Sequence, residues 1–151
     1  MNEIKKLLQE AKTIAIVGLS DKPDRDSYIV ADYLRNVDYK IIPINPNIKE
    51  WNGIKTYANL LDVPNTIKID IVDIFRRSEF VDEIVDQVLE MQNKPHAIWI
   101  QRTPFSSSPK ASLLKMQLGI KNENAAEKAK RVGMIVIQNK CIKMEHEKES
   151  G

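Results

Sequence analysis

The sequence predicts an α/β fold in which helices cover both faces of a doubly wound, parallel sheet of five strands. Five short apolar runs alternate with segments of helical periodicity, and this alternation is typical of β-α-β crossovers. The runs are apolar almost throughout, as expected for strands buried on both faces. We expect the strands at residues 13–17, 39–44, 69–74, 97–100 and 134–137, in the order 3-2-1-4-5 across the sheet.

Helical stripes separate these strands. A short helix is expected at residues 2–11, because its apolar residues fall on one face. Apolar residues at positions i, i+3, i+4 and i+7 predict longer helices at 27–37 and 78–91. Either Ser27 or Asp26 can cap the first turn of the helix at 27–37.

Turn signals organise the rest of the chain. The Asn-Gly pair within residues 50–55 predicts a tight turn, and a short helical turn is expected near 57–61. Residues 102–117 begin with an aperiodic stretch that is rich in proline and serine, and we interpret the segment as an inserted loop. Asn122 is a suitable N-cap for a helix at 123–132 that ends at Gly133.

The composition indicates one globular domain. The chain has 151 residues, of which 42% are hydrophobic and 29% are charged. We expect a single Rossmann-like domain at 1–146, which includes the inserted loop, and a polar tail at 147–151. The sequence has no run of 18 apolar residues, and its charged N-terminus lacks the apolar core of a signal peptide. These features favour a cytoplasmic protein that does not cross a membrane.

Charge and residue counts exclude several classes of function. The formal net charge is +2 and the basic residues are dispersed, so nucleic-acid binding is not expected. Cys141 is the only cysteine, which excludes an internal disulfide and a cysteine-rich metal site. His96 and His146 lack partners at metal-binding spacing, and we expect both to be structural or solvated. Ser106–Ser108 lacks the context of a hydrolase nucleophile, so no catalytic residue is assigned.

A nucleotide-binding turn is predicted where the first strand ends. Gly18 allows a ligand to approach the backbone closely, and Ser20 adds a hydroxyl and an N–H group. The helix that begins near Ser27 directs further backbone donors to the same place. Lys22 and Arg25 can meet phosphates. The loop has one glycine where the dinucleotide fingerprint has three, so the alternative is a plain turn with solvated charges.

Two further strand ends are expected beside this loop. Asn45 and Pro46 stand where an NAD site has an acidic residue, and the neutral amide counts against NAD. A proline-terminated strand with Asx turns is the alternative interpretation. Phe75, Arg76 and Arg77 follow the third strand, where guanidinium groups suit phosphate oxygens; the alternative is an arginine paired with a surface carboxylate.

Cys141 follows the fifth strand and has two interpretations. It is either a small buried residue or a thiol near a thiol-bearing ligand, with which it could form a mixed disulfide. The sequence leaves both open.

Together the motifs resemble the small stand-alone CoA-binding domain family, which is related to domains of succinyl-CoA synthetase alpha subunits and ADP-forming acyl-CoA synthetases. The resemblance covers residues from about 11 to 146. It rests on Val17-Gly18-Leu19-Ser20, Pro23, Arg25, Ser27, Tyr28, Ile42-Pro43-Ile44-Asn45-Pro46, Val72-Asp73-Ile74-Phe75-Arg76-Arg77, Trp99, Leu118-Gly119-Ile120, Asn122, Glu123, Ala125, Ala126, Cys141-Ile142-Lys143 and Glu145-His146. It implies that the ADP portion of coenzyme A lies over the Gly18–Tyr28 loop, flanked by Asn45, Pro46 and the 75–77 segment.

One departure from the family concerns the fourth strand. The family's W-x-Q strand end leads almost directly to a glycine and an asparagine-capped helix, whereas here residues 102–117 intervene before Gly119. Either Gln101 or Gln117 could occupy the family's glutamine position. The inserted segment could act as a lid, cover the pantetheine arm, mediate self-association or be disordered.

The expected function is binding of coenzyme A, or an acyl-CoA, without catalysis. The expected cofactor-binding residues are Gly18, Leu19, Ser20, Lys22, Arg25, Ser27, Tyr28, Asn45, Pro46, Phe75, Arg76, Arg77, Gln117 and Gly119. One alternative is an NAD(P)-binding Rossmann protein or oxidoreductase. The other is a non-catalytic subunit that acts in trans with a separate acyl-CoA ligase chain. The expected protein partner is either a second copy of this chain, in a homo-oligomer, or a separate ligase subunit.

Overall fold

The computed structural model describes residues 2–101 and 119–150. The elements, in chain order, are α1 (Glu3–Glu10), β1 (Thr13–Val17), α2 (Asp26–Asn36), β2 (Lys40–Ile44), β3 (Glu50–Trp51), β4 (Ile54–Lys55), the 3-10 turn η1 (Leu60–Asp62), β5 (Ile71–Ile74), α3 (Ser78–Glu90), β6 (Ala97–Gln101), α5 (Gly119–Arg131), β7 (Ile135–Lys140) and α6 (Ile142–Ser150).

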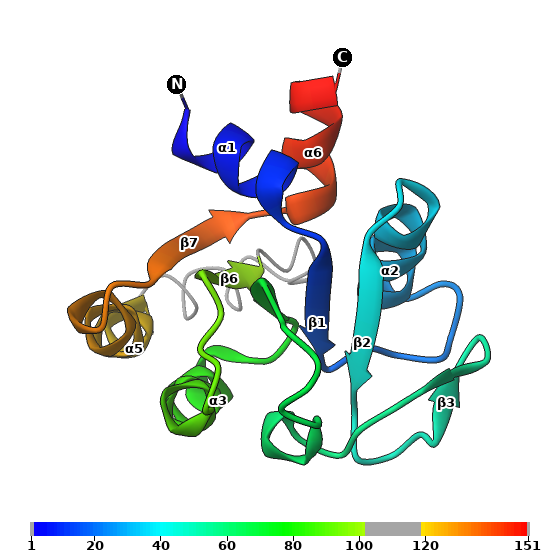
Figure 1. Cartoon of the computed structure of the whole chain (residues 1–151), viewed down its shortest axis with the longest axis horizontal. Coiled ribbons are helices and arrows are strands. Elements are labelled where there is room, and N and C mark those ends of the chain that lie inside the picture. Colours follow the sequence, from blue (N-terminus) through cyan, green and yellow to red (C-terminus); the bar gives the residue numbers. More distant parts are fainter. Residues whose placement is uncertain (1, 102–118, 151) are drawn as a thin grey trace, which may run out of the picture.

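Two helical layers enclose one parallel sheet, as Figure 1 shows. Within the described residues, five strands pair in the order β2-β1-β5-β6-β7, and every pairing is parallel. Helices α1, α2 and α6 cover one face, and α3, α5 and η1 cover the other. The α/β class and the five-stranded parallel sheet with helices on both faces are therefore confirmed.

The position of the third long strand differs from the prediction. The expected order 3-2-1-4-5 places this strand outside β2, whereas β5 lies between β1 and β6. Leu60, Val63 and Ile69 of the β2–β5 connection are buried in the same apolar cluster as α3, so the connection returns across the sheet. Apart from Asp73 of β5, the central strands are apolar almost throughout, so composition alone does not distinguish the two orders.

The sheet contributes to both apolar layers because neighbouring residues of a strand face opposite sides. In β1, Ile14 and Ile16 lie in the cluster with α1, α2 and α6, and Ala15 and Val17 lie in the cluster with α3 and α5. Each of these four residues is at most 7% exposed. The sheet therefore forms a rigid centre whose strand ends present the loops.

Two helices begin at positions that the sequence did not predict. Arg25 is the N-cap residue of α2 and makes no side-chain capping bond, so neither Ser27 nor Asp26 caps this helix. Helix α5 begins at Gly119, before the expected cap at Asn122. The predicted tight turn is confirmed, because Asn52 and Gly53 have φ angles of 48° and 81° between the antiparallel strands β3 and β4.

The end of the chain is ordered by packing. Helix α6 runs through Ser150, and its Ile142 is fully buried. The Tyr33 hydroxyl and His146 Nδ1 are 2.7 Å apart, and the Tyr39 ring packs edge-on against the same imidazole. His146 was expected to be structural or solvated in a polar end of the chain, and it proves to connect α6 with α2.

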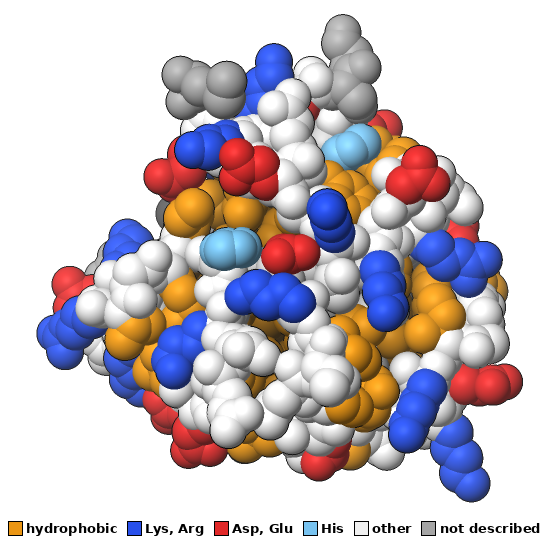
Figure 2. Space-filling model, in the orientation of Figure 1, with side chains coloured by type: hydrophobic (Ala, Val, Ile, Leu, Met, Phe, Trp, Pro, Cys, Tyr) orange, Lys and Arg blue, Asp and Glu red, His pale blue; other side chains and the backbone are white. Residues whose placement is uncertain are grey.

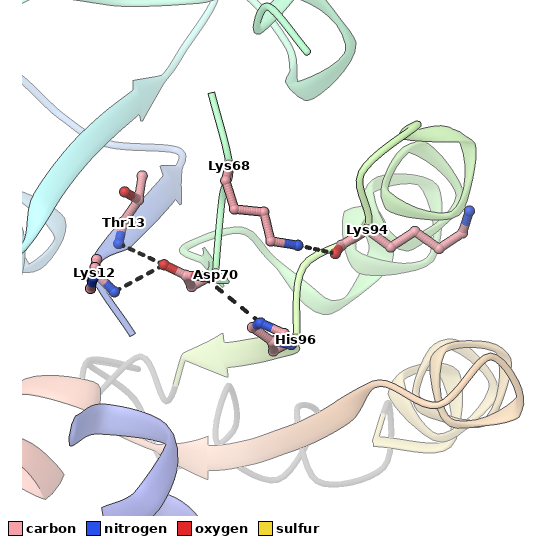
Figure 3. Close-up of polar contacts among 6 residues, drawn as sticks. All are labelled: Lys12, Thr13, Lys68, Asp70, Lys94 and His96. Atoms are coloured by element: carbon pink, nitrogen blue, oxygen red, sulfur yellow. Dashed lines mark hydrogen bonds and ion pairs between the residues drawn. The ribbon is translucent and has the colours of Figure 1, made fainter. Parts of the chain in front are cut away.

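The amino-terminal edge of the sheet is closed by Asp70 (Figure 3). Its Oδ2 accepts hydrogen bonds from the backbone N–H groups of Lys12 and Thr13, at 2.9 and 3.0 Å. Its Oδ1 lies 3.9 Å from Nε2 of His96, which precedes β6. One carboxylate therefore contacts the starts of β1 and β6 from the residue that precedes β5.

The surface carries mixed charges. Figure 2 shows basic and acidic side chains interspersed over the visible face, with no large area of one sign. This distribution agrees with the dispersed charges of the sequence and its net charge of +2. In the part of the chain that the structure describes, no helix has the length and apolarity to span a bilayer.

Candidate functional site

Gly18 marks the point at which β1 ends and the candidate site begins. Its φ angle is +86°, a conformation that residues with a Cβ rarely adopt. A Cβ at this position would lie 2.5 Å from the carbonyl oxygen of Phe75 and 3.2 Å from Cδ of Arg76. Glycine is therefore required both by the turn and by the close approach of the chain that follows β5.

The loop after Gly18 is held by its own polar groups. The Ser20 N–H donates to the Ser27 hydroxyl at 2.9 Å, and the Ser20 hydroxyl accepts from the Lys22 N–H at 3.1 Å. The Arg25 N–H then donates to the Lys22 carbonyl at 3.0 Å. Ser27, which is buried, therefore fixes the loop instead of capping α2.

Asn45 connects the end of β2 to this loop. Its side-chain amide donates to the carbonyl of the buried Leu19 at 2.9 Å, and its Oδ1 accepts from the Asn47 N–H at 2.8 Å. The second bond is the Asx turn that the sequence suggested, and the first holds the ends of β1 and β2 together. Pro46 follows on the exposed side of this turn.

Tyr28 connects the first turn of α2 to the β3–β4 hairpin. Its hydroxyl accepts a hydrogen bond from Nδ2 of Asn52 at 2.9 Å. Its ring packs edge-on against the buried Trp51, with the ring centroids 5.3 Å apart. The hairpin therefore supports the α2 side of the loop.

The two arginines after β5 differ in their surroundings. Arg76 lies beside Gly18, and its guanidinium is 4.3 Å from the centroid of the Phe80 ring. Arg77 has a side chain that is 82% exposed and pairs with Glu79, with Nη1 and Oε1 3.6 Å apart. Arg76 thus adjoins the loop, whereas Arg77 shows the surface ion pair that the sequence left open.

The loop itself carries more acidic than basic side chains. Asp21, Asp24 and Asp26 accompany Lys22 and Arg25. Partial burial raises the pKa of Asp26, which stands at the first position of α2. Positive potential for an anion therefore comes mainly from Arg76 and from the backbone N–H groups at the start of α2.

The ends of β6 and β7 are joined to the start of α6. The Trp99 indole N–H donates to the Lys140 carbonyl at 2.9 Å, and the Gln101 side-chain oxygen accepts from the Ile142 N–H at 3.3 Å. Gln101 is buried, and Cys141 beside this junction is half-buried. Gln117 lies outside the described residues, and Gly119 is the first residue of α5.

Asp73 belongs to the Val72–Arg77 motif of the family resemblance and is a further polar residue near the site. It lies in the middle of β5, is 0% exposed, and has no hydrogen-bond partner for either carboxylate oxygen among the described residues. Burial raises its pKa well above the ordinary value of 3.8. An acidic residue inside an otherwise apolar strand was the sequence signal for it.

A separate cleft of about 470 Å³ lies between α3 and α5. The Lys128 ammonium in its wall bonds to Asp82 at 2.7 Å and to Asp86 at 3.2 Å, and these contacts raise the pKa of Lys128. This cation is already neutralised by its neighbours, so the strand ends offer the better anion site. The described residues contain no group of three or more His, Cys, Asp or Glu arranged to hold a metal.

The geometry brings together most of the residues that the sequence nominated. The loop from Gly18 to Tyr28, Asn45 at the end of β2 and Arg76 after β5 lie around one edge of the sheet. The actual strand order improves this arrangement, because the ends of β5 and β1 are direct neighbours. Such a point, where chain connections leave in opposite directions, is where open α/β sheets bind ligands.

Several known proteins are similar to this chain in sequence or in structure. The chain is 38% identical over 144 residues to the uncharacterized protein YneT of Bacillus subtilis, covering 95% of this chain and 92% of that protein. It is 34% identical over 67 residues to an ADP-forming acetate–CoA ligase of Methanocaldococcus jannaschii, covering 44% of this chain and 10% of the ligase. A hypothetical protein from Pyrococcus horikoshii has a similar solved structure, with a TM-score of 0.80, 32% identity, and coverage of 99% of this chain and 91% of that one.

The family assignment rests on a match that spans nearly the whole described fold. Residues 12–147 match the family described as CoA binding domain, from the residue before β1 to a position within α6. This range contains every strand of the sheet and the loop that follows Gly18. The chain therefore belongs to the CoA binding domain family.

Proposed function

We propose that this chain binds coenzyme A, or an acyl-CoA, through its ADP moiety at the carboxyl ends of the strands, and that it has no catalytic activity of its own. Membership of the CoA binding domain family supports the choice of ligand. The cytoplasmic location expected from the sequence belongs to the same proposal.

The observation that carries this proposal is the junction of β1, β2 and β5. Gly18 has no Cβ, which allows a ligand to approach the backbone. Asn45 holds the loop through the Leu19 carbonyl, and the Arg76 side chain lies beside the glycine. A pyrophosphate placed here meets backbone N–H groups, the start of α2 and one guanidinium. The neutral amide at the end of β2 leaves room for a phosphorylated ribose, which an acidic residue would repel.

The residue assignments follow from this placement. In the proposal, Gly18, Leu19, Ser20, Ser27 and the start of α2 surround the pyrophosphate, with support from Arg76. The remaining described residues among the expected contacts are assigned to the adenosine and to the far side of the crevice: Lys22, Arg25, Tyr28, Asn45, Pro46, Phe75, Arg77 and Gly119. Gln117 lies outside the described residues and stays an expected contact. Arg77 is the weakest of these, because it is already paired with Glu79.

Isothermal titration calorimetry with CoA, acetyl-CoA, NAD and NADP tests the proposal directly. We expect CoA or acetyl-CoA to bind and NAD to bind at least tenfold more weakly, because Asn45 does not supply the acidic partner for an unphosphorylated ribose. Binding of NAD in preference to both CoA ligands would overturn the proposal. The NADP titration separates recognition of a ribose phosphate from recognition of the whole CoA molecule.

A role as a non-catalytic subunit is favoured by one observation, the 34% identity to part of an ADP-forming acetate–CoA ligase. The chain spans 10% of that ligase, and in this second candidate function the catalytic partner is a separate chain. The test is co-purification from the native host of an affinity-tagged chain, followed by an acyl-CoA ligase assay on the complex. Recovery of the tagged chain without ligase activity would contradict this second candidate.

A further inference from the structure

The candidate site leaves the polar group of Asp73 unexplained. In the sheet register, Asp73 stands beside Ile16 of β1 and Trp99 of β6. The Trp99 indole N–H already donates to the Lys140 carbonyl, so it does not serve this carboxyl group. Neither oxygen of Asp73 has a partner within the part of the chain that the structure describes.

A carboxyl group in this environment favours the neutral form. An ionised carboxylate without a partner is far too costly in an apolar interior. Burial raises the pKa of Asp73 well above 3.8 for this reason. The neutral carboxylic acid offers one O–H donor and a carbonyl acceptor. Both oxygens are buried and have no partner among the described residues.

The position of Asp73 relates it to the candidate site. Alternation along β5 places Asp73 and Phe75 on the same face, with Phe75 one step closer to the carboxyl edge. This is the face covered by α2, since Phe75 packs against the apolar cluster that contains Val30 and Leu34 of α2. Asp73 therefore lies on the face covered by α2, farther from the carboxyl edge of the sheet than Phe75 and the end of β1.

The direction of the ligand follows from the strand order. Asn45 of β2 is expected at the ribose, and Gly18 of β1 is expected at the pyrophosphate. The part of the ligand beyond the pyrophosphate then extends away from β2, toward β5 and β6. In coenzyme A this part is an uncharged arm that carries secondary amides and a hydroxyl group, each of which can pair with a neutral carboxyl group.

We propose that the Asp73 carboxyl group hydrogen-bonds an amide or hydroxyl group of the ligand arm that lies beyond the pyrophosphate. Phe75 is half-buried and lies two residues nearer to the carboxyl edge on the same face. The proposal requires its side chain to turn aside to admit this group. The inference rests on the proposed function, and it assigns to Asp73 the recognition of the arm and not of the nucleotide.

The test compares two ligands by calorimetry. One is CoA, and the other is adenosine 3′-phosphate 5′-diphosphate, which keeps the nucleotide and its phosphates but lacks the arm. For Asp73→Val we expect CoA to bind at least tenfold more weakly, whereas the affinity for the fragment stays within twofold. Asp73→Asn is the matched control, because its amide keeps a donor and an acceptor, and its CoA affinity should stay within threefold of wild type.

Thermal unfolding of the variants accompanies the titrations. Asp73→Val removes an unpaired polar group from the interior, so its melting temperature should equal or exceed that of wild type. Asp73→Ala provides the same comparison without branched volume if valine crowds the site. Higher stability combined with weaker CoA binding is a result that a merely structural role does not produce.

The outcomes separate this inference from the proposed function. Unchanged CoA affinity in Asp73→Val, or equal losses for CoA and the fragment, overturns the assignment of Asp73 while CoA binding by the wild-type chain stands. Absence of CoA binding by the wild-type chain overturns the proposed function and this inference together. Retained fragment binding with a selective loss of CoA supports both.

Discussion

Two aspartates three residues apart show how the two edges of the sheet differ. Asp70, at the amino edge, accepts two backbone hydrogen bonds and faces His96 (Figure 3). Asp73, further along β5 toward the carboxyl edge, is fully buried and has no partner among the described residues. The amino edge uses its polar groups to hold the strands, whereas the carboxyl side keeps a polar group that the described part of the protein does not satisfy.

The same contrast appears in the glycines. Gly133, at the amino edge between α5 and β7, has a φ angle of +86°, and a Cβ added there would meet nothing within 4 Å. Gly18, at the carboxyl edge, has the same φ angle but lies against the backbone of Phe75. The carboxyl edge is therefore under a second constraint, close packing of chain segments around the crevice.

The largest effect is expected from Gly18→Ala. Positive φ and the 2.5 Å approach to the Phe75 carbonyl should together lower the free energy of unfolding by about 3 kcal/mol. The matched control, Gly133→Ala, has the same φ without a clash and should cost about 1 kcal/mol. Urea denaturation measures both variants, and equal losses would show that close packing at Gly18 contributes nothing.

The next largest effect concerns the contribution of Asp73 to the pH dependence of the free energy of unfolding. Because its pKa is raised on folding, the folded state retains a proton that the unfolded chain releases above pH 3.8. Wild-type stability therefore falls as pH rises from that value toward the folded-state pKa, by at most about 1.4 kcal/mol per pH unit from this group.

Asp73→Asn removes this contribution, so its stability relative to wild type should increase between pH 5 and pH 7. Urea denaturation at both pH values gives the difference, in which the other titrating groups cancel. Parallel stability curves for the two proteins would show that Asp73 is not held neutral.

At the amino edge, Asp70→Ala leaves the N–H groups of Lys12 and Thr13 without their acceptor. We expect a loss of about 2 kcal/mol in the free energy of unfolding, with CoA affinity unchanged. His96→Ala is the control, because this exposed side chain lies 3.9 Å from the carboxylate and should change stability by less than about 0.5 kcal/mol. A loss of CoA affinity in Asp70→Ala would break the proposed division between the two edges.

The smallest expected effect separates the two arginines. Arg76→Ala should weaken CoA binding about tenfold, since the Arg76 side chain passes beside Gly18, where the proposal places a phosphate. Arg77→Ala, which removes the partner of Glu79, should change affinity less than threefold. Calorimetry decides the order, and a larger effect at Arg77 would move the anion site away from Gly18.

The fold class and much of the crevice follow from local sequence signals. Continuous apolar runs predict the strands of the sheet, and helical stripes predict the helices that cover it. Gly18, at the end of a buried strand, predicts the position of the ligand-binding loop. The strand order depended on Leu60, Val63 and Ile69 packing against the α3 face, a contact between segments that periodicity does not reveal. The roles of Ser27 and Asn45 as supports of the loop likewise depend on contacts across the chain.

The structure of the final helix was the least accessible to sequence reasoning. Its residues are mostly polar, and such a composition usually indicates a solvated end. Ile142 is fully buried, however, and His146 is matched to Tyr33 and Tyr39, which lie more than 100 positions earlier in the chain. The predicted domain limits, with a tail at 147–151, stay a prediction.

Contact between the two ends of the chain has a consequence for biosynthesis. Helix α1 lies beside α6 (Figure 1), and both belong to the apolar layer that covers Ile14 and Ile16. A ribosome releases α1 and β1 long before α6, so this face of the sheet lacks part of its apolar cover until α6 has been synthesised. The face covered by α3 and α5 is completed earlier, which makes the α6 side the one that a chaperone would have to shield.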